Sequence, residues 1–385
     1  MSPLTRCLFA IVLVPLLNGC SSAGYYSQLA DGQWQILKAR TPVATVIADP
    51  QQPPALREHL AKAQAARTFA SQHLHLPDNQ SYRLYVDLKR PYVVWNVFAT
   101  AEFSLSPVTH CFPIAGCVAY RGYYSQGAAR GEAALQRQQG KDVFISGVEA
   151  YSTLGWFDDP ILNSMLNWGD ERLATLIFHE LAHQRFYVQD DTEFNESFAS
   201  FVEQQGTRQW RMHQGLPPSS SAGLEQRDQF IALVLDTRQR LQQLYAQPLP
   251  APEMRQRKTA EFERLRREYR QLRDRQWAGN NRYDPWVNSP MNNAKLLPFG
   301  LYDQWVPAFT ALFKQSGGDW QVFYAEVEKL GKLPLPQRRA ALQQWATKAQ
   351  ADFNQPITTH EANGLVLQAP LLKAARSFGM SAFIK

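Results

Sequence analysis

The chain has 385 residues, of which 45% are hydrophobic, 12% aromatic and 19% charged, and its net charge is +6. This length allows two or three structural units and a core large enough to enclose an active site, and the composition excludes collagen-like, disordered and polytopic membrane proteins. Much of the positive excess lies in one stretch, RQRKTAEFERLRREYRQLRDR, where a helix surface can solvate it. The charge therefore predicts no nucleic-acid partner.

The N-terminus predicts an exported protein. Arg6 precedes the apolar run LFAIVLVPLL, which has the length of a signal-peptide core and is too short to span a bilayer. Residues 17–20, LNGC, resemble the lipobox of bacterial lipoproteins, so we expect residues 1–19 to be a lipoprotein signal peptide and Cys20 to carry lipid. A signal peptide with an incidental cysteine is the alternative.

The residue after Cys20 is Ser21 and not an aspartate. In lipoproteins this pattern implies export to the outer membrane, where acyl chains hold a water-soluble body at the periplasmic face. The expected location is therefore the bacterial cell envelope, with the membrane as a partner through the N-terminal lipid anchor.

Two further cysteines, Cys111 and Cys117, lie six positions apart around Pro113 and Gly116. Such a short loop can be closed by a disulfide, and an exported protein enters a compartment that permits one. We expect the two cysteines to be bridged; two reduced, buried thiols are the alternative.

The first part of the chain mixes helical and strand patterns. The patterns predict a helix at 53–74, strands at 81–88 and 92–100, a helix at 127–139 and a strand from 143. Residues 20–160 are therefore expected to form an N-terminal α/β subdomain.

Beyond residue 160, helical patterns dominate. Asp170 is placed to cap one long helix, and Asp190, three residues before Glu193, predicts a cap for a second helix that ends near Gly206. Residues 161–215 are expected to form a helical core, which the sequence GLPPSSSAG closes.

Apolar residues then repeat every three or four positions on both sides of a proline-containing turn at 248–252, which predicts a helical hairpin. The hairpin belongs to an expected C-terminal helical lobe at 224–345. The remaining residues, 346–385, form a weakly patterned tail.

The segment LIFHELAHQRF carries the clearest chemistry. His179 and His183 are four residues apart, so on a helix both imidazoles project from one face and can bind one metal ion. Glu180 lies beside the first histidine, where a carboxylate can reach a zinc-bound water without binding the metal. The pattern predicts a site for one Zn²⁺ ion with Glu180 as the catalytic base.

A third ligand is expected from the second helix. Its apolar stripe is built from phenylalanines, and at 100° per residue Glu196 lies on the opposite side and can face the first helix. Competing candidates are Glu193, which is placed to act as a cap, and Asp190 or Asp191 in the connecting turn. The structural alternative is that all these acids are solvated or capping and that the histidines merely pair.

HELAH followed by NESFA resembles the gluzincin metallopeptidases, and the wider sequence resembles predicted zinc aminopeptidases found as proteobacterial lipoproteins. The resemblance implies an α+β, zincin/gluzincin-like fold, with the N-terminal α/β subdomain, the zinc helices in the middle and the helical lobe beyond them. It makes His179, His183 and Glu196 the zinc ligands and Glu180 the base. Many gluzincins have an acid where this chain has Ser200, and Glu203 is the candidate replacement.

Three tyrosines are weaker candidates. Tyr151 follows a strand that could pair with an extended peptide, although a core strand ending in a turn explains the same pattern. Tyr302 or Tyr187 could stabilise the oxyanion of the reaction, although tyrosines more often pack.

The sequence thus predicts a zinc-dependent peptidase that acts on peptide or protein substrates. Only the family resemblance favours an aminopeptidase. The alternatives are an envelope endopeptidase and a non-catalytic scaffold that keeps the zincin fold; the intact Glu180 argues against the scaffold.

Overall fold

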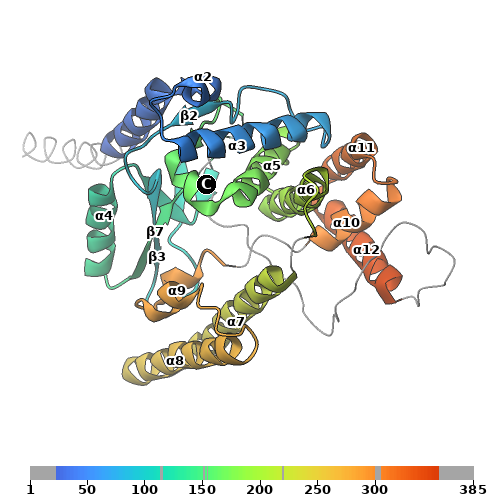
Figure 1. Ribbon diagram of the computed structural model, residues 1–385. Helices are drawn as coiled ribbons and strands as arrows, with labels where there is room; N and C mark the ends of the chain where they lie inside the picture. The colour runs from blue at the N-terminus through green and yellow to red at the C-terminus, as the bar shows by residue number, and fades with distance from the viewer. Residues whose placement is uncertain are drawn as a thin grey trace, which may run out of the picture.

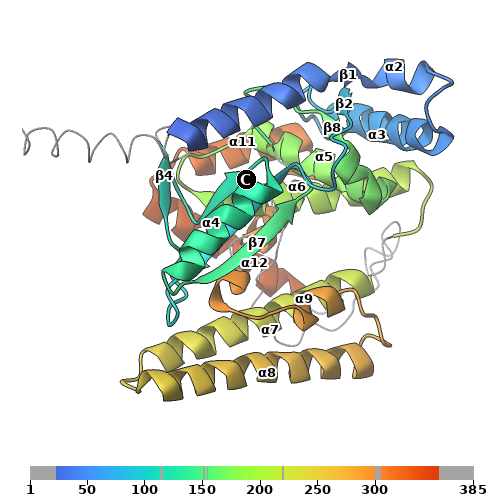
Figure 2. The ribbon, with the colours of Figure 1, turned by 90° about the vertical axis from the view of Figure 1, so that its left-hand side faces the viewer.

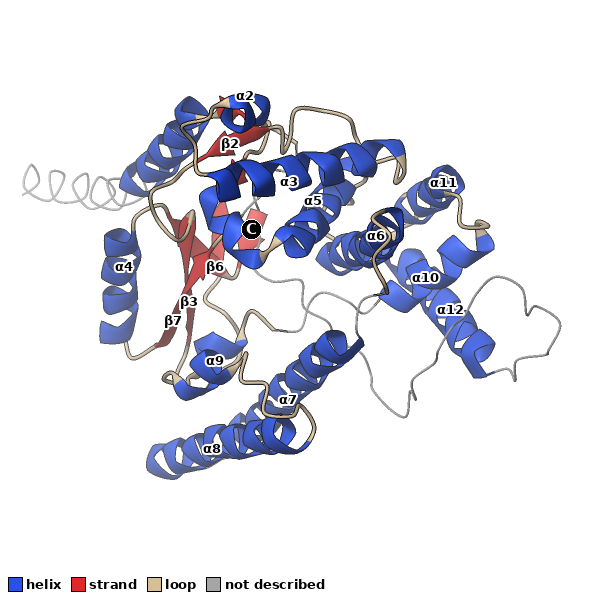
Figure 3. Cartoon of the chain, viewed as in Figure 1, coloured by secondary structure: helices blue, strands red, loops and turns tan. Residues whose placement is uncertain are grey.

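The computed structural model describes residues 23–354 except 113–115, 151, 154, 219–220 and 300–304. The expected signal peptide and Cys20 lie outside the described residues. The fold is α+β and mainly helical, with three small sheets among the described residues (Figure 3), which confirms the fold class expected from the sequence. No helix within the described part of the chain is both long and apolar enough to cross a membrane.

The N-terminal part begins with a helix over residues 23–39 and a small sheet. That sheet has the order β1-β2-β8, with β1 antiparallel to β2 and β2 parallel to β8. Its elements and the helices beside it are β1 (Thr41–Pro42), α2 (Val43–Ala48), α3 (Pro54–Gln72), β2 (Leu84–Val86) and β8 (Ile161–Leu162). Helix α3 begins at a proline, whose fixed φ suits the first turn, and it packs against the central helices (Figure 1).

The second sheet is antiparallel and has β3 (Val94–Thr100) between β6 (Tyr120–Tyr123) and β7 (Asp142–Val148). Helix α4 (Gln126–Gln138) packs against this sheet (Figure 1). Nearly every residue of β3 is buried, as expected for a β-branched and aromatic strand with neighbours on both sides.

A separate hairpin contains the two remaining cysteines. Strands β4 (His110–Phe112) and β5 (Gly116–Val118) are antiparallel, and Cys111 pairs with Cys117 across them. A disulfide joins the two cysteines, as the sequence predicted.

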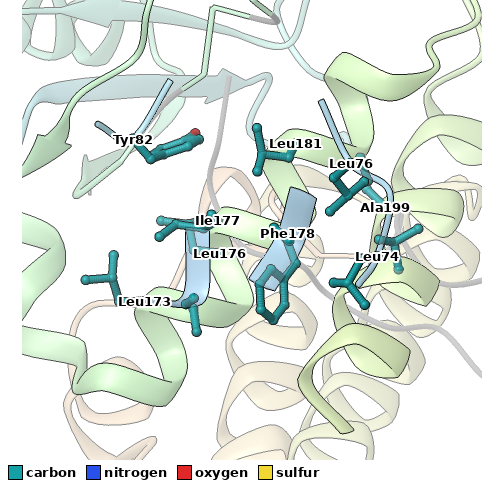
Figure 4. Packing of buried hydrophobic residues seen from close by; sticks show 14 of the residues in the cluster. Leu74, Leu76, Tyr82, Leu173, Leu176, Ile177, Phe178, Leu181 and Ala199 are labelled. Atoms are coloured by element: carbon teal, nitrogen blue, oxygen red, sulfur yellow. The ribbon is translucent and has the colours of Figure 1, made fainter. Parts of the chain in front are cut away.

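The middle of the molecule is formed by η1 (Asn163–Trp168), α5 (Asp170–Arg185) and α6 (Thr192–His213). Helix α5 is surrounded by buried side chains; Figure 4 shows its apolar residues with neighbours from other segments, including Leu74, Leu76, Tyr82 and Ala199. Because apolar residues surround the middle of α5, its polar residues His179, Glu180 and His183 are held deep in the protein.

Three details of these helices differ from the sequence predictions. Asp170 does not cap α5 but is its first residue, and its carboxylate contacts His59 and Lys62 of α3. The cap of α6 is Asp191 and not Asp190, since its side chain accepts a hydrogen bond from the amide of Phe194 at 3.2 Å.

Helix α6 also continues past Gly206 to His213. Gly206 lies where α6 meets Leu74 and Phe178, and a Cβ atom there would lie 2.7 Å from Leu74 Cδ1. The glycine therefore permits close packing within the helix and does not end it.

The C-terminal region contains the expected hairpin, formed by α7 (Ser221–Tyr245) and α8 (Ala251–Arg275), which form the lower edge of the molecule in Figure 2. Its buried side chains form a separate cluster with α9 (Asp284–Asn288) and η2 (Asn293–Leu296). An ion pair of 2.6 Å between Lys258 Nζ and Asp142 Oδ2 joins the hairpin to β7.

The last helices are α10 (Val306–Gln315), α11 (Trp320–Gly331) and α12 (Leu335–Asn354). Helices α10 and α11 form an aromatic cluster with α6, in which the ring centroid of Phe198 lies 5.8 Å from that of Phe309 and 6.2 Å from that of Phe323. This packing fixes the apolar side of α6 and turns its other side toward α5.

Candidate metal centre

Two histidines and one glutamate converge between α5 and α6. The Nε2 atoms of His179 and His183 are 3.2 Å apart, and Glu196 Oε2 lies 3.4 Å from the first and 3.6 Å from the second. All three side chains are buried. Within the described residues, this is the one group of three or more His, Cys, Asp or Glu side chains close enough together to hold a metal ion.

The sequence produces this arrangement through helix geometry. One turn separates the two histidines of α5, so their rings project from the same face, with centroids 4.8 Å apart. On α6, Phe194 and Phe198 pack against α10, which leaves Glu196 on the side that faces α5. The set predicted from the sequence is thus brought together by the structure.

The other acids considered as third ligands have different partners. Glu193 pairs with Arg339 at 3.0 Å, and Asp191 caps α6 and pairs with Arg338 at 2.7 Å. Asp190 is exposed, and its φ of 60° lies in the left-handed region. None of these three acids belongs to the group that could hold a metal among the described residues.

Glu203 orients one of the histidines. Its Oε2 atom lies 2.9 Å from Nδ1 of His179, so the imidazole is held through the nitrogen that faces away from the other two ligands. Glu203 Oε1 lies 3.5 Å from the guanidinium of Arg172. Ser200, which stands where many gluzincins have an acid, is buried, and its hydroxyl has no hydrogen-bond partner among the described residues. Glu203 therefore occupies the orienting role that the sequence left open.

The charges at this site favour a cation. Burial lowers the pKa of His179, but its hydrogen bonds to the Glu196 and Glu203 carboxylates outweigh burial and raise the pKa to about 10. Burial raises the pKa of Glu196, but the two histidines outweigh it and hold the pKa well below its usual value. Both effects express the attraction between buried carboxylates and a positive charge.

Glu180 is buried beside the group but does not belong to it. Its side chain is 2% exposed, and its Oε1 atom has no hydrogen-bond partner among the described residues. Burial, the largest cause, raises the pKa of this carboxyl, while the neighbouring histidines lower it. A carboxyl with an unused oxygen and a raised pKa is suited to accept and return a proton.

Three residues near Glu180 were not found by sequence reasoning. Tyr82 is fully buried at a φ of 63°, and its amide donates to the carbonyl of Asp159 at 2.7 Å. Ser152 bonds to Asp159 at 3.3 Å and also lowers the pKa of Glu180 by hydrogen bonding. The segment AYSTLGWFDDPIL, quoted for the family resemblance, contains Ser152 and Asp159, but no sequence signal identifies Tyr82.

The tyrosine candidates have different outcomes. The ring of Tyr187 lies 6.3 Å from that of His183, so this tyrosine is at the edge of the site. Tyr151 and Tyr302 lie outside the described residues.

The fold and the site together define an α+β protein with a buried group that could hold a metal ion and an adjacent carboxyl, one oxygen of which has no hydrogen-bond partner among the described residues. Residues 24–342 match a family described as "Putative aminopeptidase", so the chain belongs to this family, which supports a peptidase function. No curated protein and no solved structure matches the chain.

Proposed function

We propose that this protein is a zinc-dependent peptidase of the gluzincin type and that it acts as an aminopeptidase. The observation that carries the proposal is the convergence of His179, His183 and Glu196, with Glu180 buried next to them and outside the ligand set. The family match supports peptide substrates.

The donor set suits zinc. Two imidazole nitrogens and one carboxylate oxygen are a common set of protein ligands in catalytic zinc sites, which keep a further position open. His179, His183 and Glu196 would hold the ion, and Glu203 would fix the orientation of the first imidazole. When bound, zinc polarises the scissile carbonyl and lowers the pKa of water toward about 7.

Glu180 transfers the proton in this proposal. Its carboxylate takes a proton from the attacking water and later passes it to the leaving amine. Ser152 hydrogen bonds to this carboxyl. Tyr82 lies near enough to Glu180 that the negative charge of Glu180 contributes to raising the pKa of the Tyr82 hydroxyl. Glu180 is itself 2% exposed, so bulk water has little access to its carboxyl.

The site of action proposed for the enzyme is the cell envelope. The apolar run of residues 8–17 and the lipobox-like sequence LNGC support removal of residues 1–19 and acylation of Cys20. The body would then be held at the periplasmic face of the outer membrane.

The proposal is tested by measuring the metal content of the purified protein together with its hydrolysis of matched peptides that have free or blocked N-termini. One zinc per chain and cleavage that requires a free N-terminus support the aminopeptidase. Cleavage of blocked peptides at internal bonds would indicate the endopeptidase. Stoichiometric zinc without hydrolysis of any peptide would indicate the scaffold and refute the proposal.

A further inference from the structure

The first described helix, residues 23–39, is part of the folded body. Gln28 donates from Nε2 to the carbonyl of Gly122 at 3.2 Å and accepts from the amide of Tyr124 at 3.1 Å, so one side chain bridges the helix to β6 and the residue after it. Gly32 lies directly against the ring of Tyr124, where no Cβ atom would fit. Ile36, one turn later, belongs to the main core.

These contacts leave one face of the helix uncovered. The exposed residues at spacings of three and four are Ala23, Ser27, Ala30, Trp34 and Lys38. Trp34 on this face is 58% exposed, and Tyr26, eight residues earlier in the helix, is 44% exposed. We name this set, with Tyr26, the outward face.

The chemistry of the outward face suits a membrane interface. Tryptophan and tyrosine concentrate at the level of lipid headgroups, where an apolar ring and a polar tip are both satisfied. Lys38 lies over the Trp34 ring at 5.7 Å, and its ammonium can reach lipid phosphates while its stem covers the ring. Asp31 and Gln35 are also exposed and hydrogen bonded to each other at 2.7 Å, at the flank of this face.

The connection to the membrane is short. Only Ser21 and Ser22 separate Cys20 from Ala23, the first described residue of the helix. At about 3.6 Å per residue, three steps of fully extended chain reach at most about 11 Å, a few ångströms more than the roughly 5 to 8 Å of one headgroup layer. An acylated Cys20 would therefore keep the start of the described helix close to the bilayer surface.

From these observations we infer that the outward face of helix 23–39 lies on the phospholipid bilayer and sets the orientation of the catalytic body. The inference rests on the proposed lipid anchor at Cys20. A lipid attached at one point lets the body pivot, whereas Trp34, about three turns beyond Ala23, supplies a second contact. Because Gln28 and Gly32 fix the helix to the sheet, the second contact orients the whole fold.

The test uses the full, acylated protein reconstituted into vesicles of phosphatidylethanolamine and phosphatidylglycerol. Trp34→Cys is labelled with an environment-sensitive fluorophore, and lipids that carry a nitroxide near the headgroup serve as quenchers. Ala30→Cys gives a second probe on the same face and replaces only a small exposed side chain. Val322→Cys is the matched control, because Val322 is 48% exposed and belongs to α11, a helix on the opposite side of the molecule from helix 23–39 in Figure 1.

We expect blue-shifted emission and several-fold stronger quenching at positions 34 and 30 than at 322. Equal, water-like emission at all three positions in protein that floats with the vesicles would overturn this inference and leave the lipid anchor intact. Protein that does not float would overturn both. Shielding of position 34 in detergent that depends on protein concentration would show that another protein copy covers the face, which also overturns the inference. Peptide hydrolysis, measured separately in detergent, reports on the proposed activity independently of all these outcomes.

Discussion

Glu203→Gln is expected to weaken zinc binding without unfolding the protein. In the wild type, Oε2 of Glu203 lies 2.9 Å from Nδ1 of His179. The substitution keeps the shape of the side chain and an oxygen that can face this nitrogen, but it removes the negative charge. Loss of a carboxylate partner to a ligand histidine costs about 10- to 100-fold in metal affinity. This corresponds to about 1.4 to 2.7 kcal/mol of binding free energy.

Zinc affinity is measured at equilibrium against a chelator of known affinity, with circular dichroism to verify folding. Ser200→Ala is the control on the same helix, because the Ser200 hydroxyl has no hydrogen-bond partner among the described residues and its loss should not change zinc affinity. Wild-type zinc affinity in a folded Glu203→Gln protein would refute the orienting role. A loss of affinity in Ser200→Ala as large as that in Glu203→Gln would show that any change on this side of α6 has the same effect.

Further predictions concern the elements that hold the site. Phe198→Ala should lower the free energy of unfolding by about 3 to 5 kcal/mol, because Phe198 is fully buried among aromatic rings; a loss below about 1 kcal/mol in denaturant titrations would contradict this packing. Arg338→Ala should cost about 3 kcal/mol or more, because it leaves the carboxylate of Asp191 buried without its 2.7 Å partner; a double-mutant cycle with Asp191→Ala that shows no coupling would disprove the pair. Burial raises the pKa of Asp159 to about 6, so the folded protein binds this proton more tightly than the unfolded chain, and stability is lost as the pH rises from about 4 to 6. Asp159→Asn should remove that loss, about 2 to 3 kcal/mol, and an unchanged difference between variant and wild type across this range would contradict it.

The sequence was sufficient for features that depend on local periodicity. The four-residue spacing of His179 and His183 requires only a helix, and the phenylalanine stripe of α6 identifies the side on which Glu196 lies. The helical hairpin follows from the same period. These features could be predicted because each depends on residues within a few turns of one another.

Features that depend on distant residues could not be predicted. The sequence favoured Asp190 as the cap because it lies three residues before Glu193, whereas Asp191 caps the helix and pairs with Arg338, far along the chain. From the sequence, Gly206 is expected to end the helix. Only the structure, in which Leu74 packs directly against this glycine, shows that the position needs a residue without a side chain. Tyr82 reaches the vicinity of Glu180 from another segment, so no local pattern marks it.

The central claim is that Glu180 is the base of a zinc peptidase and not a ligand. It is tested most directly by measuring zinc stoichiometry and the rate of peptide hydrolysis in the same preparation of Glu180→Gln. The account predicts one zinc per chain, as in the wild type, and a rate lower by about 10²-fold or more, because the variant keeps the three ligands and loses the proton acceptor. A variant that keeps the wild-type rate, or that loses zinc and activity together, would contradict it.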